Sequence, residues 1–354
     1  MTAITDEVTV GVVANPASGR DIRRLVAAAS VFPTAEKANM VRRMLAAFAA
    51  VGVGHAMLNT DKTGISASVL RAAHTRRPGH DPDWPRLTFC DEDRRRGTAQ
   101  DTVDAVRRMV AAGARVIVCL GGDGTARVAA DACGDVPMLA LSTGTNNAFP
   151  QMREATVAGL AAGLVAVGAV DPATTVRRAG ALEVRTPGRR ELALVDVCVS
   201  SAQHVGSRAL WRPDDLLTLV CSFAEPDGVG LSSVAGLLCP SPREDPDGVV
   251  LDLAPPERAR YVVRASIAPG LVVPVGVDAF RPLRPGETLT LPRSNGVIAV
   301  DGEREIELWG GRPATVALVR DGPRCVDVAA VMREAARTGV LSIRQTTPTN
   351  WRTS

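Results

Sequence analysis

The sequence has few aromatic residues and almost no lysine. Aromatic residues make up 3% of its 354 residues, so Ala, Val and Leu must fill the core that a hydrophobic fraction of 46% allows. Lys37 and Lys62 are the only lysines, which leaves 39 arginines among the 41 basic residues. Both signs of charge are spread along the chain, and the net charge is +3. The sequence therefore lacks a basic block typical of a nucleic-acid arm or a membrane-binding patch.

Cysteine pairs and export signals are missing as well. The seven cysteines are scattered without a C-x-x-C pair, which favours a reducing compartment over a disulfide framework or a metal site. Residues 1–7 have neither the basic nor the apolar region of a signal peptide. The longest apolar stretch, Ala155–Val170, is too short and too weakly hydrophobic to span a bilayer, so we expect a buried helix there. These absences predict a soluble, cytoplasmic protein.

One glycine-rich turn stands out. Gly121-Gly-Asp-Gly-Thr125 follows an apolar run over residues 115–120 and precedes a helical pattern over 126–133. Glycine lets the backbone approach a ligand, and the N–H groups at a helix start attract an anion. A carboxylate in such a turn would repel phosphate, so Asp123 must hold a cation or take a proton, which indicates phosphoryl transfer. The simpler alternative is a strand-to-helix turn capped by Asp or Thr.

Two other phosphate-binding motifs do not occur at this turn. It has no G-x-G-x-x-G pattern of the dinucleotide-binding dehydrogenases and no Walker pattern ending in Gly-Lys-Ser/Thr. Neither lysine of the chain is expected near the site. The turn therefore predicts a nucleotide site of another kind.

The first 150 residues alternate strand patterns with helix patterns. Strands are expected at residues 8–14, 53–58, 87–90, 115–120 and 137–141. Such apolar strands are typical of a parallel sheet with helices on both faces, so we expect an α/β domain. Ligands bind beyond the carboxyl ends of such strands. Three polar turns lie at predicted strand ends, Asn15–Gly19, Gly121–Thr125 and Ser142–Asn147, and we expect them to form one site.

The second half has a different pattern. After Asp171, short runs rich in Val and Leu alternate with Pro and Gly turns, which predicts a β-rich, sandwich-like domain. A helical pattern returns at residues 326–337. We therefore expect an α/β nucleotide-binding domain at 1–170, a β-rich substrate or oligomerisation domain at 171–325, and a C-terminal helix and tail at 326–354 that pack on the first domain.

These motifs together resemble a known superfamily. Gly121–Thr125, with Asn15–Gly19 upstream and Gly144–Asn147 downstream, is similar to the motifs of the superfamily that joins NAD kinases with diacylglycerol and sphingosine kinases. Gly-Gly-Asp-Gly-Thr-x-Arg and Thr-Gly-Thr-Asn-Asn-Ala-Phe-Pro resemble its ATP–NAD kinase-like branch, which includes the acetoin catabolism X proteins. The ordered motifs cover most of the chain. The resemblance implies transfer of the γ-phosphoryl group of ATP, with Mg²⁺, to a sugar hydroxyl, above all the adenosine 2′-hydroxyl of NAD to give NADP.

The resemblance also implies roles for individual residues. Asp123 would be the catalytic aspartate, as general base or as the residue that orients the metal. Mg²⁺ would be held through the nucleotide, with Asp123 as the candidate protein ligand. Asp196 and Asp301 would contact the substrate. The nucleotide would be bordered by Asn15, Ser18, Gly19, Gly121, Gly122, Gly124, Thr125, Gly144, Thr145, Asn146 and Asn147.

The sequence departs from the family pattern at two places. Asn147 stands where lipid kinases have Asp, and Val195-Asp196 stands where NAD kinases have Asn-Glu. Asp301-Gly302 matches a family motif, but Asp-Gly is also the commonest hairpin-turn signal. A kinase for a lipid or small metabolite, polyphosphate as donor, and a nucleotide-binding regulator without catalysis stay open as alternatives. The expected partners are small-molecule nucleotides and further copies of the chain, as a homodimer or larger homo-oligomer, with no nucleic acid and no membrane.

Overall fold

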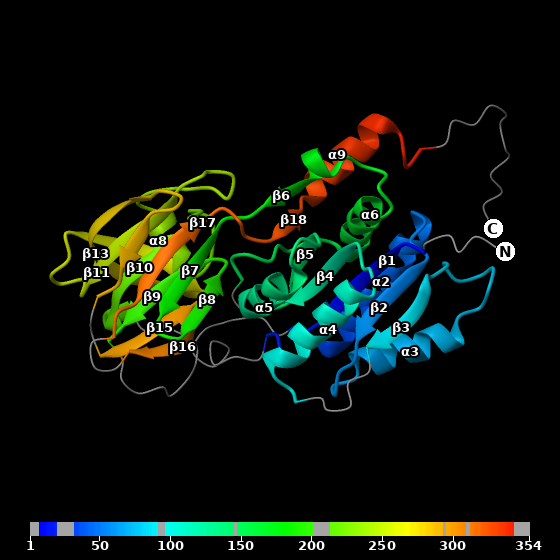
Figure 1. Ribbon diagram of the computed structural model, residues 1–354, viewed down its shortest axis with the longest axis horizontal. Helices are drawn as coiled ribbons and strands as arrows, with labels where there is room; N and C mark the ends of the chain where they lie inside the picture. The colour runs from blue at the N-terminus through cyan, green and yellow to red at the C-terminus, as the bar shows by residue number, and fades with distance from the viewer. Residues whose placement is uncertain are drawn as a thin grey trace.

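The N-terminal half is built on a parallel sheet (Figure 1). The computed structural model describes residues 7–19, 32–90, 96–144, 147–201, 213–292, 295–308 and 312–342. Five parallel strands lie in the order β3-β2-β1-β4-β5. Their bounds are Thr9–Ala14 (β1), His55–Asn59 (β2), Arg86–Cys90 (β3), Val116–Gly121 (β4) and Met138–Ser142 (β5). Because β1, β4 and β5 are neighbours, the turns that follow them lie at one edge of the sheet.

Helices cover both faces of this sheet. In β1, Val12 packs in the cluster that includes α2 and α6, whereas Val13 packs on the opposite face with α4 and α5. Strand side chains alternate in direction, so a strand buried on both faces reads as a continuous apolar run. The helices are α2 (Thr34–Ala50), α3 (Ile65–Thr75), α4 (Ala99–Ala111), α5 (Asp123–Cys133) and α6 (Ala155–Ala166). The expected α/β domain is confirmed.

Helix α6 packs closely on α2. A Cβ at Gly159 would lie 2.9 Å from the Cα of Met44, so only glycine permits this approach of the two helices. The helix occupies most of the apolar stretch that the sequence singles out, and its residues are mostly buried. In the part of the chain that the structure describes, no helix has the length and hydropathy needed to cross a membrane.

The second half forms two antiparallel sheets. A seven-stranded sheet has the order β12-β13-β11-β10-β9-β15-β16, and a four-stranded sheet has the order β14-β17-β7-β8. Val184 and Leu318 of the smaller sheet pack against Val199 and Ile298 of the larger one. The expected sandwich-like domain is thereby confirmed.

The bounds of the elements in this half are as follows. The strands are β7 (Ala181–Thr186), β8 (Arg189–Ala193), β9 (Asp196–Ser200), β10 (Leu216–Cys221), β11 (Gly248–Ala254), β12 (Tyr261–Ala268), β13 (Leu271–Leu283), β14 (Thr288–Thr290), β15 (Gly296–Val300), β16 (Glu303–Leu308) and β17 (Thr315–Val319). The short helices are the 3₁₀ helix η1 (Pro213–Asp215) and α8 (Ser232–Gly236).

Two short strands connect the halves. Strand β6 (Val176–Arg178) leads into the β-rich domain and β18 (Arg324–Val326) leads back, and both extend the parallel sheet beside β5. Helix α9 (Val328–Thr338) then packs on α6 and on α7 (Pro172–Thr175) (Figure 1). The core of the first domain is therefore completed by residues that follow the second domain in sequence.

Candidate functional site

A cleft of about 990 Å³ lies between the carboxyl edge of the parallel sheet and the β-rich domain. The turns after β1, β4 and β5 all line it, and Asp301 and Glu303 line it from the other domain. Of the residues predicted to border a nucleotide, the cleft brings together Asn15, Ser18, Gly19, Gly122, Gly124, Thr125, Gly144 and Asn147. Thr145 and Asn146 lie outside the described residues, and Gly121 ends β4 just behind the cleft.

Asp123 is the first residue of α5. The helix begins three residues earlier than the sequence pattern indicates, because Gly122 is extended and its carbonyl accepts the N–H groups of Thr125 and Ala126. The Asp123 carboxylate accepts hydrogen bonds from the N–H of Phe149 at 2.8 Å and of Ala148 at 3.1 Å. Its position is thus fixed by a separate loop, the one that follows β5, rather than by capping its own helix.

Asn147 explains why glycine is needed at two positions of the turns after β4 and β5. A Cβ at Gly122 would lie 2.8 Å from the Asn147 Oδ1 atom, and a Cβ at Gly144 would lie 2.4 Å from it. The Asn147 Nδ2 atom also donates to the Ser142 hydroxyl at 2.6 Å. These two glycines therefore let the Asn147 amide pack between the two turns. The sequence predicted only that they border a nucleotide, and not this packing of a side chain against their backbone.

A buried lysine supports the first turn. Lys37, on α2, is 1% exposed, and its Nζ donates to the carbonyls of Asn15 (3.0 Å), Pro16 (3.4 Å) and Ser18 (2.8 Å). Lys62 lines the same cleft. The expectation that neither lysine lies near the site is therefore wrong. Lys37 follows Gly19, the last residue of the first turn, by 18 residues, and only the fold brings its ammonium under that turn.

Side chains also connect the three turns to one another. The Asn15 amide donates to the Thr125 hydroxyl at 2.8 Å, and the Ser18 and Thr143 hydroxyls are hydrogen-bonded at 2.9 Å. The first bond joins the ends of the neighbouring strands β1 and β4, and the second joins the ends of β1 and β5, which lie on either side of β4. The predicted residues Asn15, Ser18 and Thr125 thus have a structural role that stands beside the nucleotide role implied by the family resemblance.

Asp301 lies on the opposite wall, in a hairpin turn. Both Asp301 (φ +50°) and Gly302 (φ +73°) have positive φ, the signature of the two-residue turn that joins β15 to β16. The Asp301 carboxylate accepts from the N–H of Val195 at 2.7 Å, of Leu194 at 3.0 Å and of Asp196 at 3.3 Å. The Asp-Gly pair therefore forms a hairpin turn at the border of the cleft, and the substrate contact predicted for Asp301 stays a prediction.

The burial of Asp301 changes its protonation. Removal from water raises the pKa of its carboxyl from 3.8 to about 7; the charge of Arg127 opposes this rise, and the charge of Asp123 adds to it. The negative charges of Asp123 and Asp301, which belong to different domains, therefore repel each other across the cleft.

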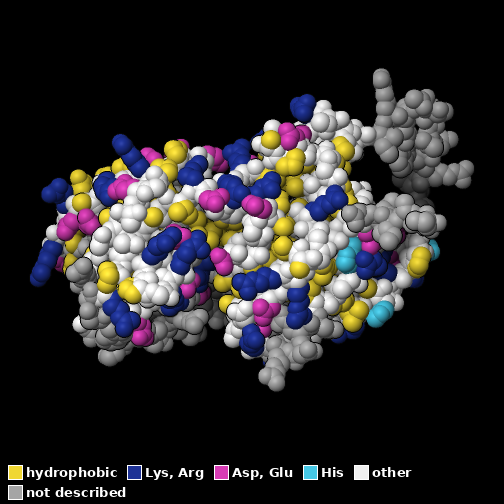
Figure 2. Space-filling view, in the orientation of Figure 1, with side chains coloured by type: hydrophobic (Ala, Val, Ile, Leu, Met, Phe, Trp, Pro, Cys, Tyr) yellow, Lys and Arg dark blue, Asp and Glu magenta, His cyan; other side chains and the backbone are white. Residues whose placement is uncertain are grey.

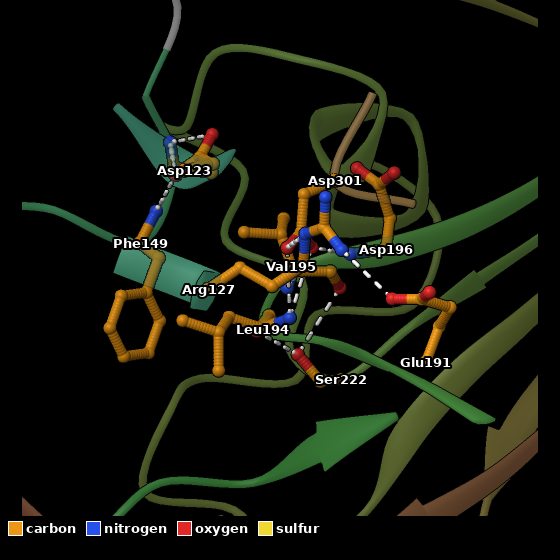
Figure 3. A network of polar contacts seen from close by, with 10 residues as sticks. Asp123, Arg127, Phe149, Glu191, Leu194, Val195, Asp196, Ser222 and Asp301 are labelled. Atoms are coloured by element: carbon orange, nitrogen blue, oxygen red, sulfur yellow. Dashed lines mark hydrogen bonds and ion pairs between the residues drawn. The ribbon is translucent and has the colours of Figure 1, made fainter. Parts of the chain in front are cut away.

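Arg127 bridges the two domains. It lies one turn after Asp123 on α5 and is 8% exposed. Its guanidinium is 3.2 Å from the Glu191 carboxylate and 3.7 Å from that of Asp301 (Figure 3). Arg127 is the last residue of the Gly-Gly-Asp-Gly-Thr-x-Arg motif, from which no role was predicted for it. Its position four residues after Asp123, on the same face of the helix, is the signal that could have indicated one.

Asp196 is placed differently from the other predicted residues. It is 4% exposed, it is not among the residues that line the cleft, and its side chain points away from Asp301 and Arg127 in Figure 3. Its backbone does serve the site, because its N–H donates to Asp301 and its carbonyl accepts the Asp301 N–H at 2.8 Å. Its predicted substrate contact stays a prediction.

The cleft is acidic. It is lined by six carboxylate side chains and two basic ones: Asp61, Asp101, Asp123, Glu191, Asp301 and Glu303 against Lys62 and Arg127. Among the described residues, no three His, Cys, Asp or Glu side chains are grouped as a preformed metal site. One or two carboxylates in an acidic cleft fit Mg²⁺ that arrives with nucleotide phosphates, since Mg²⁺ is commonly held in this way.

Comparisons with known proteins agree with this architecture. The family model of the ATP-NAD kinase N-terminal domain matches residues 10–170, and that of the acetoin catabolism protein X C-terminal domain matches residues 180–321. The crystal structure of yeast NADH kinase complexed with NADH is 14% identical, covers 96% of this chain and 90% of its own, and has a TM-score of 0.50, which shows the shared fold. Acetoin catabolism protein X of Cupriavidus necator is 41% identical over 334 residues, 93% of this chain and 92% of that protein. The chain therefore belongs to the acetoin catabolism protein X family.

Proposed function

We propose that this protein is a kinase that transfers the γ-phosphoryl group of ATP to a hydroxyl group. The fold and the N-terminal family model support a kinase of the NAD kinase and diacylglycerol kinase superfamily. The observation that carries the proposal is Asp123, whose carboxylate is held by two backbone N–H groups inside a 990 Å³ cleft between two domains. The acceptor we propose is the adenosine 2′-hydroxyl of NAD, and the product is NADP.

The proposed donor is bound where α5 begins. The N-terminus of a helix attracts phosphate through its N–H groups and its dipole, and Lys62 adds a positive charge to the same cleft. The carboxylates around it would repel ATP alone, so the nucleotide is expected to enter with its cation. Asp123 would be the residue that holds Mg²⁺, which when bound would neutralise charge on the phosphate oxygens.

Asp123 would align the acceptor hydroxyl and take its proton. The N–H groups of Ala148 and Phe149 bind the carboxylate and restrict its rotation, and Asp123 lines the cleft in which the acceptor hydroxyl would lie. Phosphoryl transfer passes through a loose transition state, so this positioning matters more than the strength of the base. Arg127 lies on the same helix as Asp123 and forms ion pairs with Glu191 and Asp301 of the β-rich domain. These ion pairs would hold the two walls of the cleft in a fixed relative position.

The proposed acceptor depends on the β-rich wall. Val195 occupies the position where NAD kinases have an amide side chain, but its N–H and that of Leu194 are engaged by Asp301. Recognition of the dinucleotide would then rest on Glu303, which lines the cleft, and on the backbone that Asp301 orders, rather than on an Asn-Glu pair. Yeast NADH kinase was crystallised with NADH, which supports a nicotinamide dinucleotide as the first acceptor to test.

The test is an assay of the purified protein with ATP, Mg²⁺ and NAD or NADH. We expect NADP or NADPH to form, and Asp123→Asn to lower kcat/KM by roughly 10²- to 10⁴-fold, the usual contribution of a general base. Asp131→Asn is the matched control, because Asp131 is an exposed aspartate on the same helix. Full activity of Asp123→Asn would remove the proposed role of this residue.

Other outcomes lead to the remaining alternatives. Formation of ADP with a lipid or a small hydroxylated metabolite, and none with NAD, would change the acceptor and keep the phosphoryl transfer. Turnover with polyphosphate in place of ATP would change the donor. Binding of ATP or NAD without turnover of any acceptor would support a nucleotide-binding regulator and overturn the kinase.

A further inference from the structure

A second cavity, of about 570 Å³, lies at the junction of the two domains. It is bordered by β6 and β18, the two strands that connect the domains, and by the start of α9. Its lining contains Arg153, Arg177, Arg178, Arg243, Arg320 and Arg333, against the two carboxylates of Glu244 and Asp327. In Figure 2, basic side chains gather beside hydrophobic ones where the two domains meet.

Two peptide groups separate this cavity from the acidic cleft. The carbonyl of Ala148 accepts from the Arg243 guanidinium, and the N–H of the same peptide, on Phe149, donates to Asp123. The carbonyl of Leu194 accepts from the Ser222 hydroxyl at 2.6 Å, and the N–H of that peptide, on Val195, donates to Asp301 (Figure 3). The C=O and N–H of a trans peptide point in opposite directions, so each peptide has one polar group toward each cavity.

The arginines of the cavity are only partly neutralised. Arg178 pairs with Asp135 and Asp321, and Arg177 lies 3.7 Å from Asp327. Arg243 lies 3.3 Å from Glu225. Within the described ranges, no carboxylate lies in ion-pair distance of Arg153, Arg320 or Arg333. The contacts recorded for the first two are to the Gln151 side chain and to a backbone carbonyl. Guanidinium groups without carboxylate partners around one cavity favour an anionic ligand, and their planar geometry suits phosphate.

The other side of the cavity is apolar. Leu139, Phe149 and Phe223 line it, and both phenyl rings are buried. The Arg243 guanidinium lies over these rings, 4.4 Å from the centroid of Phe223 and 5.7 Å from that of Phe149. A cavity of this volume with an apolar wall and a few convergent charges has the usual character of a small-molecule site.

We propose that this cavity binds a small organic phosphate and that binding alters the affinity of the acidic cleft for nucleotide. The phosphate would contact the arginines at the mouth, and the organic part would lie against Phe223 and Leu139. An anion near Arg243 would compete with the Ala148 and Phe149 carbonyls for its guanidinium. Those carbonyls belong to the loop that holds Asp123, so the loop is the connection between the two sites. The coupling part of this proposal rests on the proposed nucleotide site.

The first experiment measures binding of phenyl phosphate by isothermal titration calorimetry, with phenol and inorganic phosphate as probes that lack one half of the ligand. We expect phenyl phosphate to bind most tightly. The double variant Arg320→Ala/Arg333→Ala should weaken it at least about tenfold, since charge-assisted hydrogen bonds are lost. Arg258→Ala/Arg264→Ala removes the same charge from exposed positions elsewhere and should leave binding unchanged. Equal affinity in both double variants would overturn the site.

A third variant locates the ligand. If phenyl phosphate binding is lost in Lys62→Met, which removes a positive charge from the acidic cleft, and kept in Arg320→Ala/Arg333→Ala, the probe occupies that cleft and the proposal fails. Both arginines are exposed, so the double variant is expected to melt at the wild-type temperature. This melting temperature checks that any lost binding does not come from unfolding.

The second experiment measures the Kd of Mg·ATP with and without saturating phenyl phosphate. We expect a change of about fivefold or more, the lower range of coupling between sites. The change should vanish in Arg320→Ala/Arg333→Ala. An unchanged Kd in the wild type would overturn the coupling. If Mg·ATP does not bind at all, the proposed kinase function fails and the coupling fails with it, while the phenyl phosphate titrations still decide whether the cavity is a site.

Discussion

The two walls of the acidic cleft hold an aspartate in similar ways and leave it in different states. On the α/β wall, Asp123 begins a helix and is bound by two N–H groups of a neighbouring loop. On the β-rich wall, Asp301 forms a hairpin turn, is bound by three N–H groups and is buried, which raises the pKa of its carboxyl to about 7. The first wall thus has a carboxylate that lines the cleft, and the second keeps one buried within the protein.

This difference in exposure suggests that the two aspartates have different roles, one in the reaction and one in stabilising the fold. A residue that takes a proton from a ligand must reach it, whereas a buried carboxylate that accepts several N–H groups mainly fixes the backbone around it. Asp301 orders Leu194 and Val195, the residues at which the chain turns from β8 into β9. We therefore expect changes to Asp301 to act first on stability, and changes to Asp123 to act first on turnover.

The largest effect on stability should come from pH, through Asp301. Its pKa is raised from 3.8 in the unfolded chain to about 7, so between these values the folded protein binds the extra proton. The free energy of unfolding should then fall as pH rises toward and through 7, by about 3 kcal/mol between pH 5 and 8. Urea unfolding at the two pH values measures this. Asp301→Asn, which cannot titrate, should lack this decrease, and a parallel pH dependence of both proteins would contradict the assignment.

The two lysines offer a contrast on the α/β wall. Lys37→Met should cost about 2 kcal/mol of stability, because three carbonyls of the first turn lose their buried donor, and should also raise the KM for ATP. Lys62→Met should raise the KM with almost no loss of stability, since Lys62 is exposed at the cleft. Thermal unfolding and steady-state kinetics test the pair. Equal effects on melting temperature would refute the supporting role of Lys37.

The smallest of these effects should come from the bridge between the walls. Arg127→Lys keeps the charge but loses the planar fork that meets Glu191 and Asp301, which should cost about 1 kcal/mol. Because a lysine ammonium at this position would lie farther from Asp301 than the guanidinium does, it should lower the pKa of the Asp301 carboxyl less. In the pH series, the fall in the free energy of unfolding should then occur at a higher pH than in the wild type. The same series on Arg107→Lys, an exposed position on α4, serves as control and should match the wild type.

The α/β wall was largely predictable from the sequence. Buried parallel strands appear as apolar runs, and polar turns such as Asn15–Gly19 follow them directly, so neighbouring strand ends imply a shared site. The family resemblance added the role proposed for Asp123. The sequence predicted that the helix begins at Ala126, but α5 begins three residues earlier, at Asp123, directly after the extended Gly122.

The β-rich wall was less predictable because its structure depends on contacts between residues that are distant in the sequence. Residues 192–199 form one run rich in Val and Leu, yet the chain turns at Leu194-Val195 because the N–H groups there bind Asp301, more than 100 residues away. In the sequence of β16, Glu305 and Glu307 alternate with Ile306 and Leu308. This alternation is short and weak, and no strand was predicted there. The support given by Lys37 was also invisible, since it depends on where α2 lies under the first turn.

The return of the chain through β18 has a consequence for the order of folding. Val326, Val328, Val331 and Ala335 belong to the same hydrophobic cluster as α2 and α6. During synthesis, this cluster stays incomplete while the whole β-rich domain emerges, because its last members follow that domain. The N-terminal domain therefore cannot finish folding by itself, and one face of α6 stays exposed to water until the C-terminal helix has been made.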